Sequence, residues 1–195
     1  GQPAEEPITG AKAMVDAGLY TTFGTAKPDF FIGMHTAPGP VGAVVSSPGP
    51  KMAGTDQIDI LFRGVGGHGS MPQMTKDPVL MAALAIVEFQ AIVSRTVTPQ
   101  ETAVLTVGSV QAGSDNNVIP ATALLKANLR WYSPAVREQL IAGIKAVSNG
   151  IAHTYGMPED QLPIITMKGG STPLVNDAAL ADRLASSLKE TIGEA

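Results

Sequence analysis

The chain is organised around Val65-Gly66-Gly67-His68-Gly69-Ser70-Met71-Pro72. This stretch joins an alternating, strand-like run at 57–63 to a long apolar segment that begins at Pro78. Glycine permits tight turns and close approach of neighbouring backbone, so we expect a sharp, open turn here. The one ionisable side chain in the turn is His68. Its glycine neighbours leave it free to project toward a group outside its own domain.

Strand and helix signals alternate on both sides of this turn. Ile58, Ile60 and Phe62 alternate with polar residues, which predicts a half-buried strand. Asp77-Pro78 and Ser133-Pro134 each predict a helix start, with an N-cap residue followed by proline at the first position. Further strands are predicted at 102–111, 121–132 and 162–167. The order strand–helix–strand–strand–helix–strand predicts a ferredoxin-like βαββαβ domain of the α+β class, with a four-stranded antiparallel sheet and two helices.

The first predicted helix is unusually apolar. Between Val79 and Val93 only Glu88 and Gln90 are strongly polar. A helix that is apolar all round must be covered on more than one side. The sheet covers one side, and the other needs either a second helix of the same domain or a partner chain.

The flanks differ from this middle part in composition. We expect a short helix at 10–17, a buried strand at 30–32 that ends in Gly33-Met34-His35, and another strand at 41–45. Residues 46–50 and 169–173 are rich in serine, glycine and proline and predict linkers, and Asn176 is expected to cap a final helix at 177–192. We therefore expect residues 54–168 to be inserted between 1–53 and 169–195, two parts of one other domain of a longer protein.

Composition excludes several classes of function. The 195 residues carry a net charge of −4 without a lysine or arginine cluster, which argues against nucleic acid and anionic membranes. A ferredoxin-like RNA binder is further disfavoured because the strands lack aromatic residues at base-stacking positions. There is no cysteine, so disulfides and thiolate metal sites are excluded. We see no signal peptide and no uncharged run of the roughly 18–20 residues that a membrane span needs, and the cellular location stays open.

Two other chemical interpretations of the glycine-rich turn fail on their context. The run from Gly64 to Gly69 has the form G-x-G-x-x-G, but the following helix begins only at Asp77, too late to meet a dinucleotide pyrophosphate. Ser70 does not lie in a G-x-S-x-G nucleophile elbow, and no such elbow occurs in the chain. The choice left by spacing alone is between a spectator histidine and a functional one.

The N-terminal flank holds a possible metal set. Glu5-Glu6 and His35 offer carboxylate and imidazole donors, which suit Zn, Mn or Co, and adjacent glutamates can divide the roles of ligand and base. A Glu-Glu pair on its own is usually a solvated surface pair. His35 is better placed, because functional sites collect at strand ends in α/β sheets. His153 lies among polar neighbours and is expected on the surface.

Four motifs in order resemble one family. The motifs are Gln2-Pro3-Ala4-Glu5-Glu6, Gly33-Met34-His35, Gly66-Gly67-His68-Gly69-Ser70-Met71-Pro72 and Asn117-Val118-Ile119-Pro120. Together they are similar to the two-metal amidohydrolases that include hippurate hydrolases, N-acyl-amino-acid amidohydrolases and indole-acetyl-amino-acid hydrolases, which are relatives of glutamate carboxypeptidase. The resemblance implies that the ferredoxin-like part is a lid and dimerisation domain, inserted into a larger α/β catalytic domain.

The resemblance also assigns roles to individual residues. Glu5 matches the general acid/base, and Glu6 and His35 match ligands of two divalent metal ions (Zn, Mn or Co). His68 matches the lid histidine, which in dimers reaches the partner's active site and stabilises the oxyanion. Asn117 matches a polar residue that faces the substrate, and Arg130 an arginine that holds the substrate carboxylate. Pro7-Ile8-Thr9 departs from the glycine-rich stretch of many relatives, and the family's Cys-Gly-His-Asp-type segment and late histidine ligand are not in this chain.

These observations predict a parent protein that hydrolyses the amide bond of N-acyl amino acids or small peptides. The chain itself is expected to supply the homodimerising lid and to be inactive alone, and the two metal ions are assigned to the parent enzyme. The alternative is a non-catalytic dimerisation module, or a relative that has lost its metal site.

Overall fold

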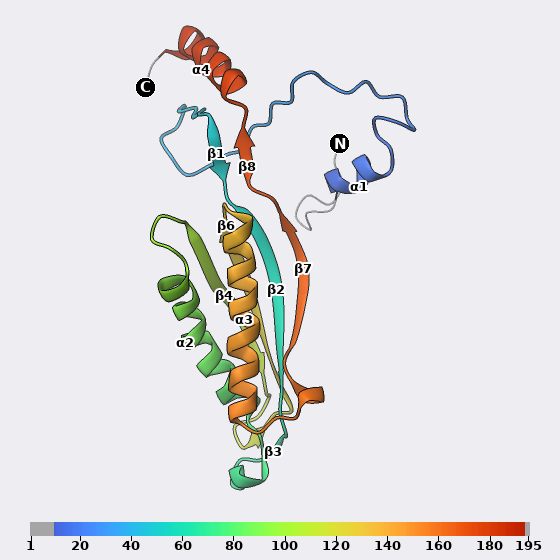
Figure 1. The fold of residues 1–195 in the computed structure, drawn as a ribbon, viewed down its shortest axis with the longest axis vertical. Coiled ribbons are helices and arrows are strands. Elements are labelled where there is room, and N and C mark those ends of the chain that lie inside the picture. The colour runs from blue at the N-terminus through green and yellow to red at the C-terminus, as the bar shows by residue number, and fades with distance from the viewer. Residues whose placement is uncertain (1–9, 194–195) are drawn as a thin grey trace. The chain divides into compact units, whose positions relative to one another are not determined.

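The structure is a computed structural model that describes residues 10–193 (Figure 1). The chain divides into two compact units, one of residues 52–174 and one made from both flanks, 1–51 and 175–195. The larger unit contains the four-stranded sheet, the two long helices and the glycine-rich turn with His68.

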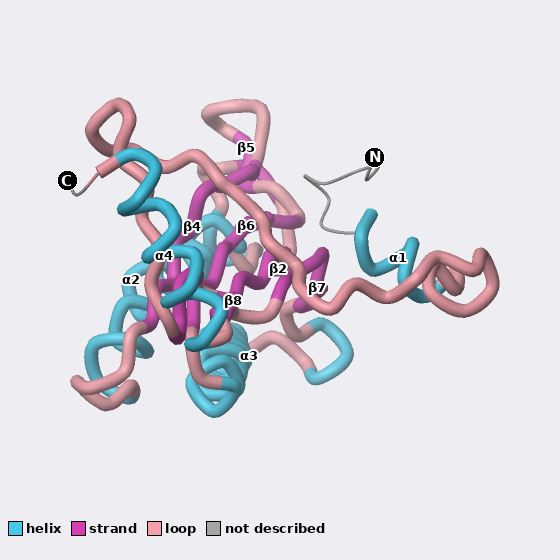
Figure 2. The backbone as a smooth tube through the Cα atoms, turned by 90° about the horizontal axis from the view of Figure 1, so that it is seen from above, coloured by secondary structure: helices cyan, strands magenta, loops and turns pink. Residues whose placement is uncertain are grey.

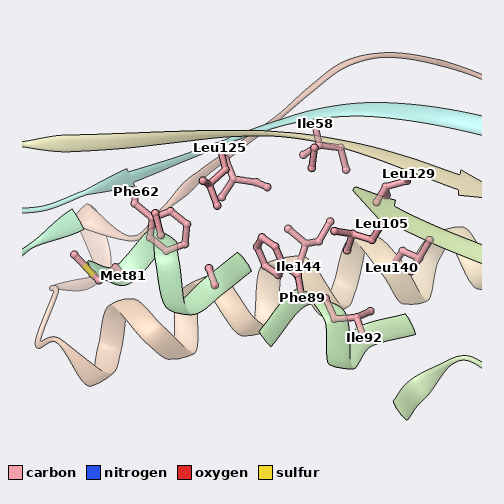
Figure 3. Packing of buried hydrophobic residues seen from close by; sticks show 14 of the residues in the cluster. Ile58, Phe62, Met81, Phe89, Ile92, Leu105, Leu125, Leu129, Leu140 and Ile144 are labelled. Atoms are coloured by element: carbon pink, nitrogen blue, oxygen red, sulfur yellow. The ribbon is translucent and has the colours of Figure 1, made fainter. Parts of the chain in front are cut away.

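The larger unit is a two-layer α+β domain, as the order of sequence signals predicts. Its four-stranded sheet has the order β4-β6-β2-β7, and every neighbouring pair is antiparallel. Both long helices lie on one face of the sheet, and the other face is uncovered within this unit (Figures 1 and 3). The elements are β2 (Gly54–Arg63), α2 (Pro78–Thr96), β4 (Ala103–Ala112), β6 (Thr122–Trp131), α3 (Pro134–Thr154) and β7 (Ile164–Ser171).

The core lies between the sheet and the two helices (Figure 3). Ile60 and Phe62 from β2 and Phe89 from α2 are fully buried there, as alternation and helical spacing require. Burying each such side chain contributes about 1.5–3 kcal/mol. All residues of this core cluster come from the larger unit.

Helix boundaries agree with the sequence signals, with one difference in the capping. Asp77 caps α2, because its Oδ1 accepts hydrogen bonds from the backbone N–H groups of Val79 (2.8 Å) and Leu80 (3.3 Å). Ser133 occupies the N-cap of α3 but makes no side-chain capping bond, contrary to the expectation that both helices start in the same way. Gly156 follows α3 with a φ of +69°, the left-handed conformation that glycine adopts most easily.

By length and apolar composition alone, α2 is the one helix among residues 10–193 that could cross a membrane. Its inward face is nevertheless part of the protein core, and it packs against α3, β4 and β6. The packing is that of a core helix of a folded domain. The buried residues are Pro78, Met81, Ala82, Ala85, Phe89 and Ile92.

The flanks form less regular structure than the sequence predicts. The strands expected at 30–32 and 41–45 are wrong: both segments lie in the long loop that follows α1, and Phe31 is 82% exposed (Figure 2). An apolar run becomes a strand only when another strand can pair with it and a layer can cover it. The described part of the flanks supplies neither to these segments.

The regular elements of the flanks partly overlap the expected linkers. The first linker continues into a strand, β1, which pairs with β8 at the end of the second linker, and β7 extends to Ser171. Asp177 caps the last helix instead of Asn176, whose amide donates to the Ser47 carbonyl at 2.9 Å. The elements are α1 (Gly10–Asp16), β1 (Gly49–Met52), β8 (Leu174–Asn176) and α4 (Ala178–Ile192).

Candidate functional site

The glycine-rich turn forms a small second sheet at one end of the larger unit. Strand β3 (Gly67–His68) pairs antiparallel with β5 (Val118–Ile119), and His68 lies opposite Val118 (Figure 1 labels β3). The Gly69 N–H donates to the Asn117 carbonyl at 2.8 Å. Two of the predicted site residues, His68 and Asn117, are thus brought together from positions about 50 residues apart. We call residues 64–77 with 117–120 the tip.

The glycines of the tip are required by close packing of backbone. A Cβ on Gly64 would lie 2.2 Å from the Lys76 carbonyl oxygen, and one on Gly66 would lie 2.8 Å from that of Ile119. None of the glycines at 64, 66, 67 and 69 has a positive φ. Glycine is therefore needed at these positions for space and not for an unusual backbone conformation. Two backbone hydrogen bonds between Val65 and Lys76, of 2.9 and 3.0 Å, close the base of the tip. The tip is consequently a braced ribbon, where the sequence suggested an open turn.

The His68 side chain is exposed and held at one ring nitrogen. Its Nδ1 lies 2.8 Å from the Ser70 hydroxyl and accepts the Ser70 backbone N–H at 3.2 Å. Nε2 makes no hydrogen bond with any residue in the described range. The backbone beneath is fixed as well, because the His68 carbonyl accepts from the Met71 N–H at 2.9 Å. The imidazole therefore offers Nε2 to a group outside the domain.

Arg130 lies at the opposite end of the sheet from the tip. It is opposite Thr55 on β2 and Val104 on β4, whereas Thr122, at the other end of β6, is opposite Arg63. Eight residues of extended strand separate Arg130 from Thr122, about 26 Å. Arg130 is exposed, and its Nε donates to Asn128 Oδ1 at 2.9 Å. Within one chain, Arg130 and His68 cannot contact the same small molecule.

The predicted metal residues are not assembled within residues 10–193. Glu5 and Glu6 lie outside the described residues. His35 is exposed in a loop, with its Nδ1 2.6 Å from the Thr36 carbonyl oxygen, and its Nε2 is the donor left for a metal. The described residues hold no cluster of three histidines or acids that could bind an ion. The His35 imidazole could serve as one ligand of a Zn, Mn or Co ion. A hydrolytic site, however, needs about three protein ligands for each metal ion.

An ion pair between the buried Asp56 and the partly exposed Arg137, which sequence reasoning missed, braces the Arg130 end of the sheet. The Asp56 carboxylate, in a residue only 4% exposed, accepts from Arg137 Nε (2.8 Å), from an Arg137 terminal nitrogen (2.9 Å) and from Trp131 Nε1 (2.8 Å). The hydrogen bond to Asp56 is the main reason that the pKa of Arg137 is raised. A sequence signal existed, because Asp56 shares the apolar face of Ile58 and Ile60, where an acid needs a cationic partner. His153 is on the surface as expected, 2.9 Å from Glu159.

Comparison with known proteins defines the class of this domain. The family model of the peptidase dimerisation domain (M20_dimer) matches residues 53–156, which include both long helices, three of the four strands of the main sheet and the tip. The chain belongs to this family.

Several curated relatives are similar over most of the chain. N-acetyldiaminopimelate deacetylase of Streptococcus sanguinis (strain SK36) is 36% identical over 184 residues, which cover 94% of this chain and 47% of that protein. The enzyme of the same name from Streptococcus pneumoniae (strain Taiwan19F-14) is 36% identical over 193 residues, 98% of this chain and 50% of the relative. The chain thus spans about half the length of the curated relatives it matches. Their names describe amide hydrolysis, the class of reaction that the four motifs predict.

Solved structures agree with the fold. A putative aminohydrolase from methicillin-resistant Staphylococcus aureus matches 75% of this chain and 38% of its own, with a TM-score of 0.62 and 28% identity. An aminobenzoyl-glutamate utilization protein from Klebsiella pneumoniae matches 79% of this chain and 38% of its own, with a TM-score of 0.60 and 25% identity. The ferredoxin-like fold, the α+β class and the amidohydrolase resemblance expected from the sequence are confirmed.

Proposed function

We propose that this chain is the lid and dimerisation part of a metal-dependent amidohydrolase. Its substrate would be an N-acyl amino acid, and an N-acetylated diamino acid is favoured by the name of the two curated streptococcal relatives. One observation carries the proposal: the tip holds His68 beside Asn117 on a braced ribbon. The imidazole is held through Nδ1, which leaves Nε2 available to a group outside the domain. A rigid, exposed donor of this kind suits the recognition of a carbonyl oxygen.

The position of the chain connections favours action on a partner's site. The polypeptide enters the sheet at Gly54 and leaves it after Ser171, and both lie at the Arg130 end. The tip is beyond the far end of β2, whose ten residues extend for about 30 Å. We infer that Arg130 serves the site of its own subunit and that His68 serves the site of the other.

The surface for a second copy is the outer face of α2 together with the free edge of β4. This face exposes an apolar stripe, of which Val87, 66% exposed, is the most prominent member. Strand β4 is an edge strand of the sheet and lies beside α2. In a dimer with a two-fold axis, the stripe of each copy would pack against the same surface of the other copy. Both stripes of the dimer would then be covered by one contact. The stripe consists of Val79, Leu80, Leu84 and Val87.

The chemistry follows from residues of this chain and the groups they would meet. Divalent metal ions, when bound, lower the pKa of water and polarise a carbonyl. Glu5 would take a proton from the attacking water and return it to the leaving amine. His68 would donate from Nε2 to the developing oxyanion, and Asn117 would contact the substrate beside it. Arg130 would hold the substrate carboxylate, because a guanidinium binds carboxylates in a bidentate geometry.

Replacement of His68 in the full-length enzyme tests this proposal. His68→Ala should lower kcat by roughly 10²–10³-fold, as expected for the loss of one oxyanion donor, while metal content stays unchanged. His153→Ala is the matched control, since it removes an exposed histidine from the same domain. Steady-state kinetics with an N-acetyl amino acid and metal analysis provide the readout. Near-normal kcat would remove His68 from the mechanism, and loss of metal would make it a ligand.

A further inference from the structure

Ser70 makes two contacts with the same nitrogen of His68. Its hydroxyl lies 2.8 Å from Nδ1, and its backbone N–H donates to Nδ1 at 3.2 Å. A backbone N–H can only donate a hydrogen bond. Nδ1 must therefore carry a lone pair in this arrangement, and the hydroxyl, which can act either way, donates to it as well.

We propose that Ser70 is a positioning residue that holds His68 in the neutral tautomer with its proton on Nε2. The Nδ1–H tautomer would place two donors, Nδ1–H and the Ser70 N–H, against each other. In the Nε2–H tautomer the outward-facing nitrogen is the donor, which is the form that an oxyanion requires. The catalytic part of this inference rests on the proposed function, whereas the tautomer itself does not.

The backbone around Ser70 keeps this geometry in place. The Met71 N–H donates to the His68 carbonyl at 2.9 Å and closes a turn over residues 68–71. On the other side the Gly69 N–H is held by Asn117. The ring nitrogen and the Ser70 amide are thus presented to each other by fixed backbone, and the hydroxyl adds the second, side-chain contact.

The tautomer can be measured directly by long-range ¹H–¹⁵N correlation spectra of the 195-residue chain, at a pH where the imidazole is neutral. Of its three histidines, His68 is assigned by the signals lost in His68→Gln. We expect His68 with an unprotonated Nδ1 and a protonated Nε2. Ser70→Ala should raise the Nδ1–H fraction several-fold, and Ser70→Thr, which keeps the hydroxyl, should restore the original spectrum. Ser114→Ala, which removes a hydroxyl bonded to Asp115 in an exposed loop, is the control and should change nothing.

Kinetics of the full-length enzyme then separate this inference from the proposed function. Ser70→Ala should reduce kcat roughly tenfold with little change in KM, a part of the 10²–10³-fold loss caused by removing an oxyanion donor, and Ser70→Thr should recover it. A His68 that is mainly Nδ1–H, or a tautomer unchanged in Ser70→Ala, overturns the role of Ser70 even if His68→Ala is inactive. A shifted tautomer with normal activity in His68→Ala would instead overturn the proposed function.

Discussion

The two ends of the four-stranded sheet are built for different purposes. At the Arg130 end, Asp56 is buried and its carboxylate accepts hydrogen bonds from both Arg137 and Trp131. At the tip end, His68 is exposed and only one of its ring nitrogens is engaged. We therefore infer that this domain is stabilised mainly at the end where the chain enters, and that its chemistry lies at the end farthest from it.

Removal of the buried carboxylate should give the largest effect on stability. Asp56→Ala removes the acceptor shared by the Arg137 guanidinium and the buried Trp131 N–H, while Glu138 still accepts from Arg137. It should lower the free energy of unfolding by about 3 kcal/mol. Asp59→Ala, on the open face of the same strand, should change it by less than about 0.5 kcal/mol. Urea unfolding followed by fluorescence of the single tryptophan measures both. If both variants lost the same free energy of unfolding, the ion pair would not be what stabilises this end of the sheet.

A charge on the apolar stripe should separate the subunits while leaving each end of the sheet intact. Val87→Asp would bury an unpaired carboxylate in the proposed interface, and we expect the dimer Kd to rise at least 100-fold, about 2.7 kcal/mol. Ala146→Asp places the same charge on an exposed position of α3, outside the stripe, as a control. Analytical ultracentrifugation reports the result. An unchanged dimer in Val87→Asp would move the interface elsewhere.

A single methyl group at the base of the tip should have a smaller effect. Gly64→Ala would force the Lys76 carbonyl away from its present position, and overpacking of this kind costs about 1–3 kcal/mol. Gly108→Ala is the matched control, because an added Cβ there meets nothing within 4 Å. Hydrogen exchange of the Lys76 amide, which donates to Val65, should accelerate only in Gly64→Ala. No difference between the variants would mean that the tip is not braced at this point.

The sequence predicts the middle of the chain far better than its flanks. Alternation at Ile58, Ile60 and Phe62 and the cap at Asp77 arise from short-range patterns, and the sheet that completes them lies within the same 123-residue unit. The apolar segments at 30–32 and 41–45 have strand-like composition but no strand to pair with among the described residues. Composition indicates what a segment would bury, whereas the partner decides whether it becomes a strand.

The sequence predicts which residues form the candidate site better than it predicts how they are arranged. The motifs around His68 and Asn117 identify both residues, but their meeting depends on β3 and β5, two-residue strands too short for a periodic signal. The sequence presents Ser70 only as a candidate nucleophile, since its contact with Nδ1 depends on the turn geometry. Arg137 could not be paired with Asp56 from spacing, because 81 residues separate them. The roles of Glu5, Glu6, His35 and Arg130 stay predictions.

Subunit complementation tests most directly whether the tip serves the partner's site. Full-length His68→Ala and Glu5→Ala enzymes are each expected to be nearly inactive as homodimers. In a purified heterodimer of the two, one composite site would again combine an intact Glu5 with an intact His68, and we predict clear recovery of activity at that one site. A verified heterodimer that remains as inactive as either homodimer would place His68 in the active site of its own subunit and contradict the separation of the two ends.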